Sequence, residues 1–294
     1  MDYFYKFGPA VFKLRDFSVN SFLRIWLWKL DPYRIENADE CNTELLTASP
    51  DKYDHLLKSS TIIHNQPSGF YARQIFKAEN GDYFLHLKEK STNIDSLLFH
   101  ITKDFKKISL LIDNTETSGQ AAFEYIGRSA IYSMISLSVL GLHGVLTEHN
   151  GMGFIITAPS ETGKTTHARL WRDNKNALII NGDNACCYKK NGAWVGFGVP
   201  WCGTSGEEIN RSVPVQSLVI LERGKENKAE IISTYEAFSL ALSSVQCPVW
   251  DRDISDKAIA LFDEFLNDIT VIRLKCTPDA ESVEVLEKAL EEIE

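Results

Sequence analysis

The chain has 294 residues, of which 44% are hydrophobic and 24% charged, a balance typical of a soluble globular protein with a large core. Its 31 basic and 40 acidic residues give a formal net charge of −9. This charge argues against a nucleic-acid or anionic-membrane partner, because both need a basic surface. The six cysteines form no CxxC pair, and the N-terminus shows no secretion signal, so we expect reduced thiols and a cytoplasmic protein.

Residues 1–115 are predicted to form a smaller, mostly β region that serves as an accessory or substrate-binding part. Strand-like runs at 70–76 and 82–88 flank Glu79-Asn80-Gly81, which is a hairpin signal. A further strand is expected at 108–112. No residue of this region points to a particular chemistry.

Residues 116–294 show the pattern of a mixed α/β domain. The predicted elements are a helix over 120–142, strands over 153–157 and 177–181, a hairpin of 186–189 with 193–197, a hairpin of 217–221 with 229–233, a strand over 270–274, and a C-terminal helix. That helix is predicted to be capped by Thr277-Pro278-Asp279, with proline at its first position. Because strict βαβ alternation is missing, the sequence favours a mixed sheet of the α+β kind over a doubly wound parallel one.

Residues 153–171 have the order strand, small-residue loop, helix that a phosphate-binding P-loop requires. The loop starts at Ala158, where the usual pattern has glycine, and ends in Gly-Lys-Thr. Its backbone N–H groups and the positive end of the following helix can hold phosphate oxygens. Lys164 is expected to reach the β- and γ-phosphates of ATP, and the Thr165 hydroxyl to bind Mg²⁺. The residues predicted to contact the nucleotide are Ser160, Glu161, Thr162, Gly163, Lys164, Thr165 and Thr166. The alternative is a Gly-Lys turn that only opens a helix.

A phosphoryl-transfer site also needs a carboxylate for Mg²⁺. Asp183 follows the next apolar strand, where its carboxylate would lie beside the loop. The alternative for Asp183 is an Asx turn within Gly182-Asp183-Asn184.

Three further features could complete such a site. His143, just before the P-loop strand, could carry a proton or bind phosphate. Glu207 and Glu208 lie in a small-residue loop that could close over a ligand, and Arg211 could offer positive charge to the transferred phosphate. A solvated loop is the alternative for this segment.

Four segments together resemble the catalytic core of HPr kinase/phosphorylase and, more broadly, the phosphoenolpyruvate (PEP) carboxykinase-like P-loop fold. They are His-Gly-Val-Leu at 143–146, Gly-Phe-Ile-Ile at 153–156, Pro-Ser-Glu-Thr-Gly-Lys-Thr-Thr at 159–166 and Ile-Ile-Asn-Gly-Asp at 179–183. The resemblance covers roughly residues 140 to 275. It looks closest to stand-alone kinase relatives, some of which phosphorylate a serine of a precursor peptide.

The resemblance implies phosphate and Mg²⁺ roles for Lys164 and Thr165, a metal-binding role for Asp183, and a place near the reacting phosphate for His143. The first aspartate of the family's pair, the expected base, is Gly182 here. The base would then be His143 or Asp183, unless the substrate hydroxyl needs little help. The family's segment for phosphorolysis is not recognisable, so a kinase alone is expected.

The leading hypothesis is therefore an ATP- and Mg²⁺-dependent kinase that transfers the γ-phosphate to a hydroxyl, expected to be that of a serine, of a peptide or protein. One alternative is a small-molecule kinase acting on a sugar, polyol or nucleoside. Another is a nucleotide-binding regulatory protein without catalysis. Relatives with this core often form oligomers, so this protein could be a homo-oligomer or a monomer.

Overall fold

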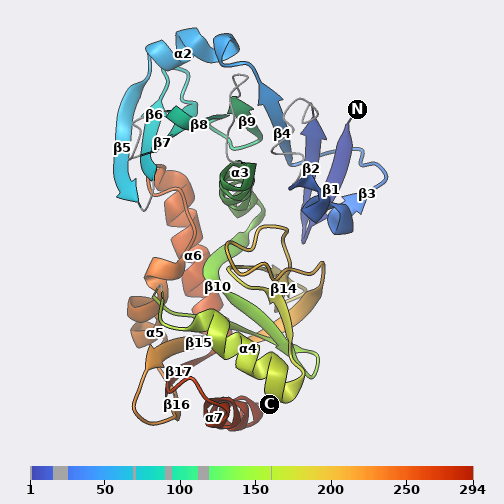
Figure 1. Cartoon of the computed structure of the whole chain (residues 1–294), viewed down its shortest axis with the longest axis vertical. Helices are drawn as coiled ribbons and strands as arrows, with labels where there is room; N and C mark the ends of the chain where they lie inside the picture. Colours follow the sequence, from blue (N-terminus) through green and yellow to red (C-terminus); the bar gives the residue numbers. More distant parts are fainter. Residues whose placement is uncertain are drawn as a thin grey trace. The chain divides into compact units, whose positions relative to one another are not determined.

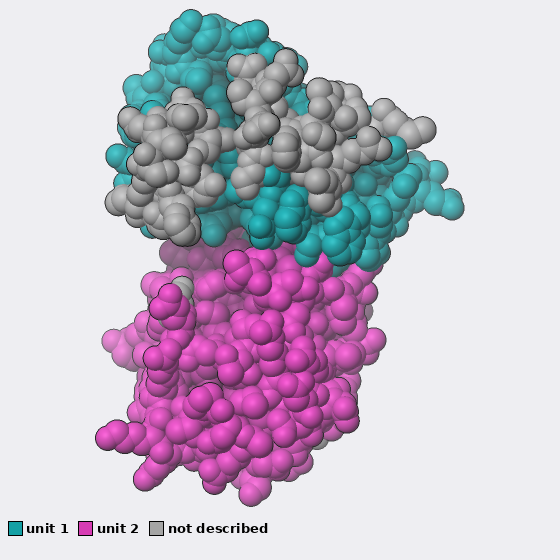
Figure 2. All heavy atoms as spheres, in the orientation of Figure 1, with its two compact units in different colours: residues 1–133, 249–251 teal, residues 134–248, 252–294 magenta. Residues whose placement is uncertain are grey.

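The computed structural model describes residues 2–15, 26–68, 71–89, 95–111, 119–159 and 161–293. The chain divides into two compact units (Figures 1 and 2). Unit 1 comprises residues 1–133 and 249–251, and unit 2 comprises residues 134–248 and 252–294.

Within its described residues, unit 1 forms a nine-stranded mixed sheet in the order β3-β1-β2-β4-β9-β8-β7-β6-β5 (Figure 1). The predicted hairpin is confirmed: β6 and β7 pair antiparallel around Gly81, whose φ of +90° suits a residue without Cβ. The elements are β1 (Tyr3–Phe7), β2 (Ala10–Arg15), η2 (Leu27–Tyr33), β3 (Arg34–Ile35), β4 (Thr43–Ala48), η3 (Pro50–Tyr53), α2 (Asp54–Lys58), β5 (Thr61–Ser68), β6 (Tyr71–Lys77), β7 (Tyr83–Glu89), β8 (Asp95–Ile101), β9 (Lys107–Leu111) and α3 (Gly119–Met134).

Unit 2 contains, in its described residues, an eight-stranded mixed sheet in the order β11-β10-β13-β14-β15-β17-β16, with β12 paired to β10. Strand β11 is antiparallel to β10 but parallel to β15, and β15 is parallel to β17. The elements are η4 (Ile135–Leu137), β10 (Val139–His149), β11 (Met152–Thr157), α4 (Lys164–Lys175), β12 (Leu178–Asn181), β13 (Asn184–Lys190), β14 (Ala193–Phe197), β15 (Ser212–Arg223), β16 (Lys228–Ile231), α5 (Thr234–Ala241), η5 (Leu242–Ser244), α6 (Arg252–Asp268), β17 (Thr270–Cys276) and α7 (Ala280–Glu291).

Helices cover both faces of the unit 2 sheet because its strands are apolar on both sides. Along β11, Phe154 and Ile156 pack in a core cluster with Trp171 of α4 and residues of α7. The residue between them, Ile155, packs in a second cluster with residues of α5 and α6. The two-residue period of the strand thus sends neighbouring side chains into separate cores, and the loop after β11 lies between the helical layers.

The predicted helix over 120–142 is too long. Helix α3 ends at Met134, a short 3₁₀ turn follows, and Ser138 adopts a left-handed φ of +60° before β10 begins. Val139 and Leu142 are fully buried in the sheet of unit 2. A short apolar run such as 139–142 is compatible with a buried strand as well as with a helix. Here it forms a strand because its side chains are buried in the sheet of unit 2.

The predicted pairing of 217–221 with 229–233 is also wrong, because β17 lies between β15 and β16. Strand β17 buries Val271, Ile272 and Leu274, which favours an interior position, whereas β16 has no buried residue and takes the edge. At the C-terminus the cap is Asp279 alone, whose side chain accepts from the Ser282 N–H at 3.1 Å; proline precedes the cap rather than following it. None of the helices built from the described residues has the length and apolar character needed to cross a membrane.

Candidate active site

The loop between β11 and α4 has the predicted order of strand, loop and helix. Helix α4 begins at Lys164, and Gly163 precedes it with a φ of +121°, a conformation that L side chains rarely adopt. Ala158 accommodates its methyl group by burying it in the core cluster beneath the loop. Thr165 is half-buried and Thr166 exposed, both in the first turn of α4. Ser160 lies outside the described residues. The N-terminus of α4 therefore faces a loop that can hold an anion.

Lys164 turns back under the loop and is only 8% exposed. Its ammonium donates to the Ala158 carbonyl at 3.0 Å and lies 3.2 Å from Nε2 of His143. Burial lowers the pKa of Lys164, and the nearby charge of Asp183 partly offsets this. The side chain is thus held at the base of the loop by two acceptors that a phosphate oxygen can replace.

His143 connects Lys164 to Asp183. Its Nδ1 lies 3.2 Å from Oδ1 of Asp183, and its Nε2 faces the lysine. Because an ammonium can only donate, Nε2 is assigned the lone pair and Nδ1 the proton that is donated to Asp183. The ring is also fixed from the backbone side, where the Thr157 hydroxyl donates to the His143 carbonyl at 3.1 Å. The imidazole ring therefore presents an oriented acceptor nitrogen beside the loop.

Asp183 does not form the Asx turn that was the alternative for this position. The turn is made instead by Asn181, whose Oδ1 accepts from the N–H groups of Asp183 and Asn184 at 3.0 and 2.7 Å. The Asn181 amide also donates to the carbonyls of Val199 and Trp201, and the residue is completely buried. This leaves the Asp183 carboxylate, about one third exposed, directed toward His143.

Gly182 lies where the resemblance described above implies an aspartate. Ser205 fills the space that an aspartate side chain would need. A Cβ at Gly182 would lie 2.3 Å from Oγ and 2.6 Å from Cβ of Ser205. Ser205 is itself held by a hydrogen bond to the Cys202 carbonyl at 2.6 Å. No carboxylate fits at this position while the 202–207 loop keeps this conformation.

The small-residue loop is tied to the protein on both sides. The Glu207 carbonyl accepts from the Gly182 N–H at 2.9 Å, and its carboxylate accepts from Arg172 of α4 at 2.8 Å. Arg169, also on α4, lies 3.3 Å from the same carboxylate. The loop therefore supports the turn that carries Asp183, with Glu207 engaged by two arginines.

Arg211 is not brought to this cluster. Its guanidinium forms an ion pair with Glu148, with Nη2 to Oε1 at 2.6 Å. Glu148 follows His143 by five positions on β10, which corresponds to about 16 Å along a strand. The predicted site residues that do meet are His143, Lys164 and Asp183.

A magnesium ion could use Asp183 and Thr165 as protein ligands. Mg²⁺ is typically held by one or two carboxylates, with phosphate and water completing six oxygens. In the described part of the chain, no group of three or more His, Cys, Asp or Glu side chains is placed to hold a metal by itself. The donor set fits a metal that arrives with a nucleotide, for which Asp183 supplies the carboxylate.

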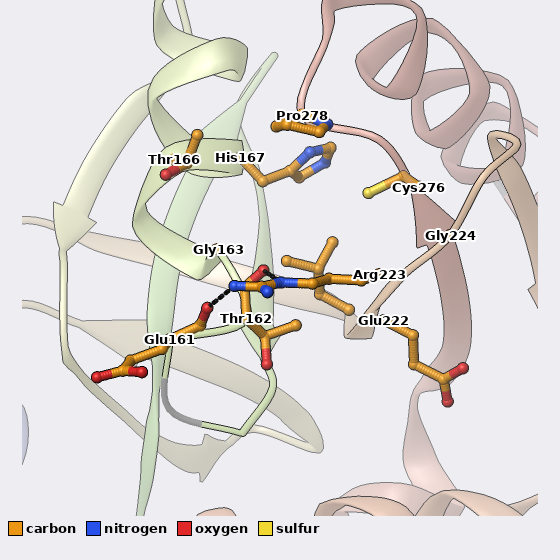
Figure 3. Close-up of a pocket in the computed structure, with 11 residues that line it drawn as sticks. Glu161, Thr162, Gly163, Thr166, His167, Glu222, Arg223, Gly224, Cys276 and Pro278 are labelled. Carbon is orange, nitrogen blue, oxygen red and sulfur yellow. Dashed lines mark hydrogen bonds between the residues drawn. The ribbon is translucent and has the colours of Figure 1, made fainter.

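Two cavities lie against the loop. One of about 460 Å³ is lined by loop residues, the first turn of α4 and the ends of β15 and β17 (Figure 3). The other, of about 250 Å³, is lined by His143, the loop start at Ala158 and Pro159, and residues of α5 and η5. Because α4 and α5 cover opposite faces of the sheet, the loop has a cavity on each side.

Sequence reasoning missed Asn181, Ser205 and Arg223. Arg223 donates to the carbonyls of Glu161 and Thr162 and so fixes the loop from outside (Figure 3). An asparagine between a buried strand and Gly-Asp was a usable turn signal. Nothing in the sequence signals Arg223, because its approach to the loop follows from the parallel pairing of β11 with β15.

Among solved structures, 45 chains match this one. No family model and no curated protein matches this chain. The structure of the HPr(Ser) kinase/phosphatase from Coxiella burnetii aligns over 52% of this chain and 97% of that chain, with 11% identity and a TM-score of 0.30. At this level of similarity, the match assigns no role to any residue of this chain.

Proposed function

We propose that this protein is an ATP- and Mg²⁺-dependent kinase with a PEP carboxykinase-like P-loop core, which transfers the γ-phosphate to a hydroxyl of a peptide or protein. The observation that carries the proposal is the position of Lys164. Its ammonium lies at the base of the loop, beside the N-terminus of α4, and in contact with His143, which in turn contacts Asp183. Loop, lysine, proton acceptor and carboxylate are the parts that phosphoryl transfer requires.

Each part has a role in the proposed reaction. The loop N–H groups and Lys164 bind the phosphates, which replace Ala158 and His143 as partners of the ammonium. Thr165 and Asp183 would hold the Mg²⁺, which would supply positive charge against the negative charge of the transferred group. When Lys164 moves to phosphate, Nε2 of His143 is free to accept the proton of the acceptor hydroxyl. Asp183 keeps the ring oriented and stabilises the imidazolium.

The assignment of the proton acceptor to His143 is supported by Gly182. Gly182 has no side chain that could accept a proton, and Ser205 occupies the space that the expected aspartate would need. Glu207 is paired with Arg169 and Arg172. His143 presents a lone pair at Nε2 toward the loop, and Asp183 is needed for the metal.

The cavity beside His143 is the proposed entry for the acceptor. Its lining combines apolar residues with Ser243 and Ser244. At about 250 Å³ it is smaller than the roughly 300–1,000 Å³ of typical small-molecule pockets. A single serine side chain entering from a longer chain fits this size. So does a small polyol, which keeps a small-molecule kinase as the second candidate.

The proposal is tested by incubating the protein with γ-labelled ATP, Mg²⁺ and a size-fractionated cell lysate. Lys164→Ala serves as the inactive variant and Lys190→Ala as the matched control, because Lys190 is an exposed lysine at the end of β13. Label in a peptide or protein that depends on Lys164 supports the proposal. Label confined to small molecules assigns the second candidate. ATP binding without any transfer would instead indicate a regulatory protein.

A further inference from the structure

The larger cavity is formed where three parallel strands end. Strands β11, β15 and β17 run side by side in one direction, and Arg223 at the end of β15 pairs with Cys276 at the end of β17. In open α/β sheets, ligands bind in the crevice beyond the carboxyl ends of the strands. Here that crevice has a volume of about 460 Å³ and shares a wall with the phosphate loop (Figure 3).

We propose that this cavity binds the nucleoside of the nucleotide whose phosphates the loop holds. The inference rests on the proposed function and extends it to the base and ribose. The cavity opens against residues 161–163 of the loop and the first turn of α4, so a nucleotide can run from the loop into it. The cavity on the His143 side is left for the acceptor, and the two substrates meet at the loop from opposite faces of the sheet.

The walls of the cavity suit a planar, largely apolar group. Leu221, Cys276 and Pro278 line it, and Figure 3 shows the ring of His167 beside Pro278 and Cys276. Aromatic and apolar surfaces of this kind bind a base by stacking and by exclusion of water.

His167 contributes its ring face rather than hydrogen bonds. Its Nε2 accepts from the Trp171 indole at 3.3 Å, and its Nδ1 lies 3.3 Å from the Ser282 hydroxyl. Burial lowers the pKa of His167 to about 4, so the ring is uncharged near neutral pH. With both nitrogens engaged inside the protein, the ring is held in place as one wall of the nucleoside site.

Arg223 links the nucleoside site to the phosphate site. Arg223 lines the cavity, and its guanidinium donates to the carbonyls of Glu161 and Thr162. Those carbonyls belong to the segment whose N–H groups would face the phosphates. The wall and the loop are therefore fixed relative to each other before a nucleotide binds, which favours binding of both halves together.

The proposal is tested with substitutions that fill the cavity. Each variant is then compared for binding of ATP, which has a nucleoside, and of tripolyphosphate, which has none. Cys276→Phe places a bulky group where the thiol points into the cavity, and Pro278→Phe does the same from the exposed rim (Figure 3). Cys247→Phe is the matched control, because Cys247 packs against the core on the α5 face, away from this cavity. Affinities for ATP and for inorganic tripolyphosphate are measured by calorimetry, and thermal unfolding checks that each variant is folded.

We expect Cys276→Phe, Pro278→Phe or both to bind ATP at least tenfold more weakly than wild type does. Their affinity for tripolyphosphate should stay within twofold of the wild-type value. Unchanged ATP affinity in both folded variants would overturn the inference and leave the phosphate site intact. Equal loss of ATP and tripolyphosphate would also overturn it, because the cavity would then act only through the loop. Wild-type protein that binds neither ligand would instead refute the proposed function.

Discussion

Lys164 is a residue whose position serves binding at the expense of stability. A buried ammonium with two neutral acceptors lacks the water that would solvate it, and the pKa of Lys164 is lowered for that reason. Such a group is retained where a ligand charge compensates it, which is the situation at a phosphate site.

Replacing Lys164 by methionine should therefore stabilise the protein without ligand. Since the folded-state pKa lies below 10.5, the folded protein binds this proton more weakly than the unfolded chain does. The charge thus costs stability at neutral pH, and wild-type stability recovers as the pH rises from the folded-state pKa toward 10.5. Thermal unfolding should give Lys164→Met a higher Tm than wild type at pH 7, with the difference shrinking at pH 10. Lys190→Met should show neither effect, and a lower Tm for Lys164→Met would contradict this account.

At the scale of elements, the sequence predicted the parts that depend on local pattern. The strand-loop-helix order, the hairpin of β13 and β14, and the strand before Asp183 follow from apolar runs bounded by turn residues. The insertion of β17 between β15 and β16 does not, because strand order depends on which apolar faces are buried together. The prediction that Arg211 belongs to the site is wrong for the same reason. Arg211 pairs with Glu148, which lies on β10 five positions after His143.

The contact between Gly182 and Ser205 determines where the Asp183 turn sits. Gly182→Ala would force Cβ into Ser205, and overpacking of this kind typically costs about 1–3 kcal/mol. Removing the opposing side chain in Gly182→Ala/Ser205→Gly should recover part of this loss. Urea unfolding of the two single variants and the double variant measures the coupling between these positions. Strictly additive effects would show that the loop does not hold the turn.

His167 joins α4 to α7 through its contact with Ser282, and within α4 it accepts from the Trp171 indole. Its pKa is lowered from 6.5 to about 4 by burial, so the unfolded chain binds the additional proton between these values. Stability is therefore fully present above pH 6.5 and is lost as the pH falls toward 4.

Between pH 7 and 4.5 this residue should account for a loss of about 2–3 kcal/mol in unfolding free energy. His167→Gln should lose that much less stability than wild type over the same range, although it starts lower at pH 7 because its hydrogen bonds change. Urea unfolding at both pH values measures the difference. Equal losses in the two proteins would mean that His167 is not the titrating group.

Over the whole molecule, the residues of the proposed site come from one unit. His143, Lys164, Asp183 and both cavities belong to unit 2. Unit 2 is interrupted by residues 249–251, which belong to unit 1, where Asp251 accepts from the Tyr83 hydroxyl at 2.9 Å. We therefore expect nucleotide binding to be a property of unit 2. The accessory or substrate-binding role of residues 1–115 stays a prediction.

The most direct test of the account is the affinity for ATP in the presence of Mg²⁺, measured by calorimetry for wild type, Lys164→Ala and Lys190→Ala. A hydrogen bond to a charged group is worth about 1.5–3 kcal/mol, which corresponds to roughly 10- to 100-fold in affinity. We predict that wild type and Lys190→Ala bind equally and that Lys164→Ala binds weaker by that factor. Equal binding by all three proteins would show that the loop before α4 is not where the phosphates lie.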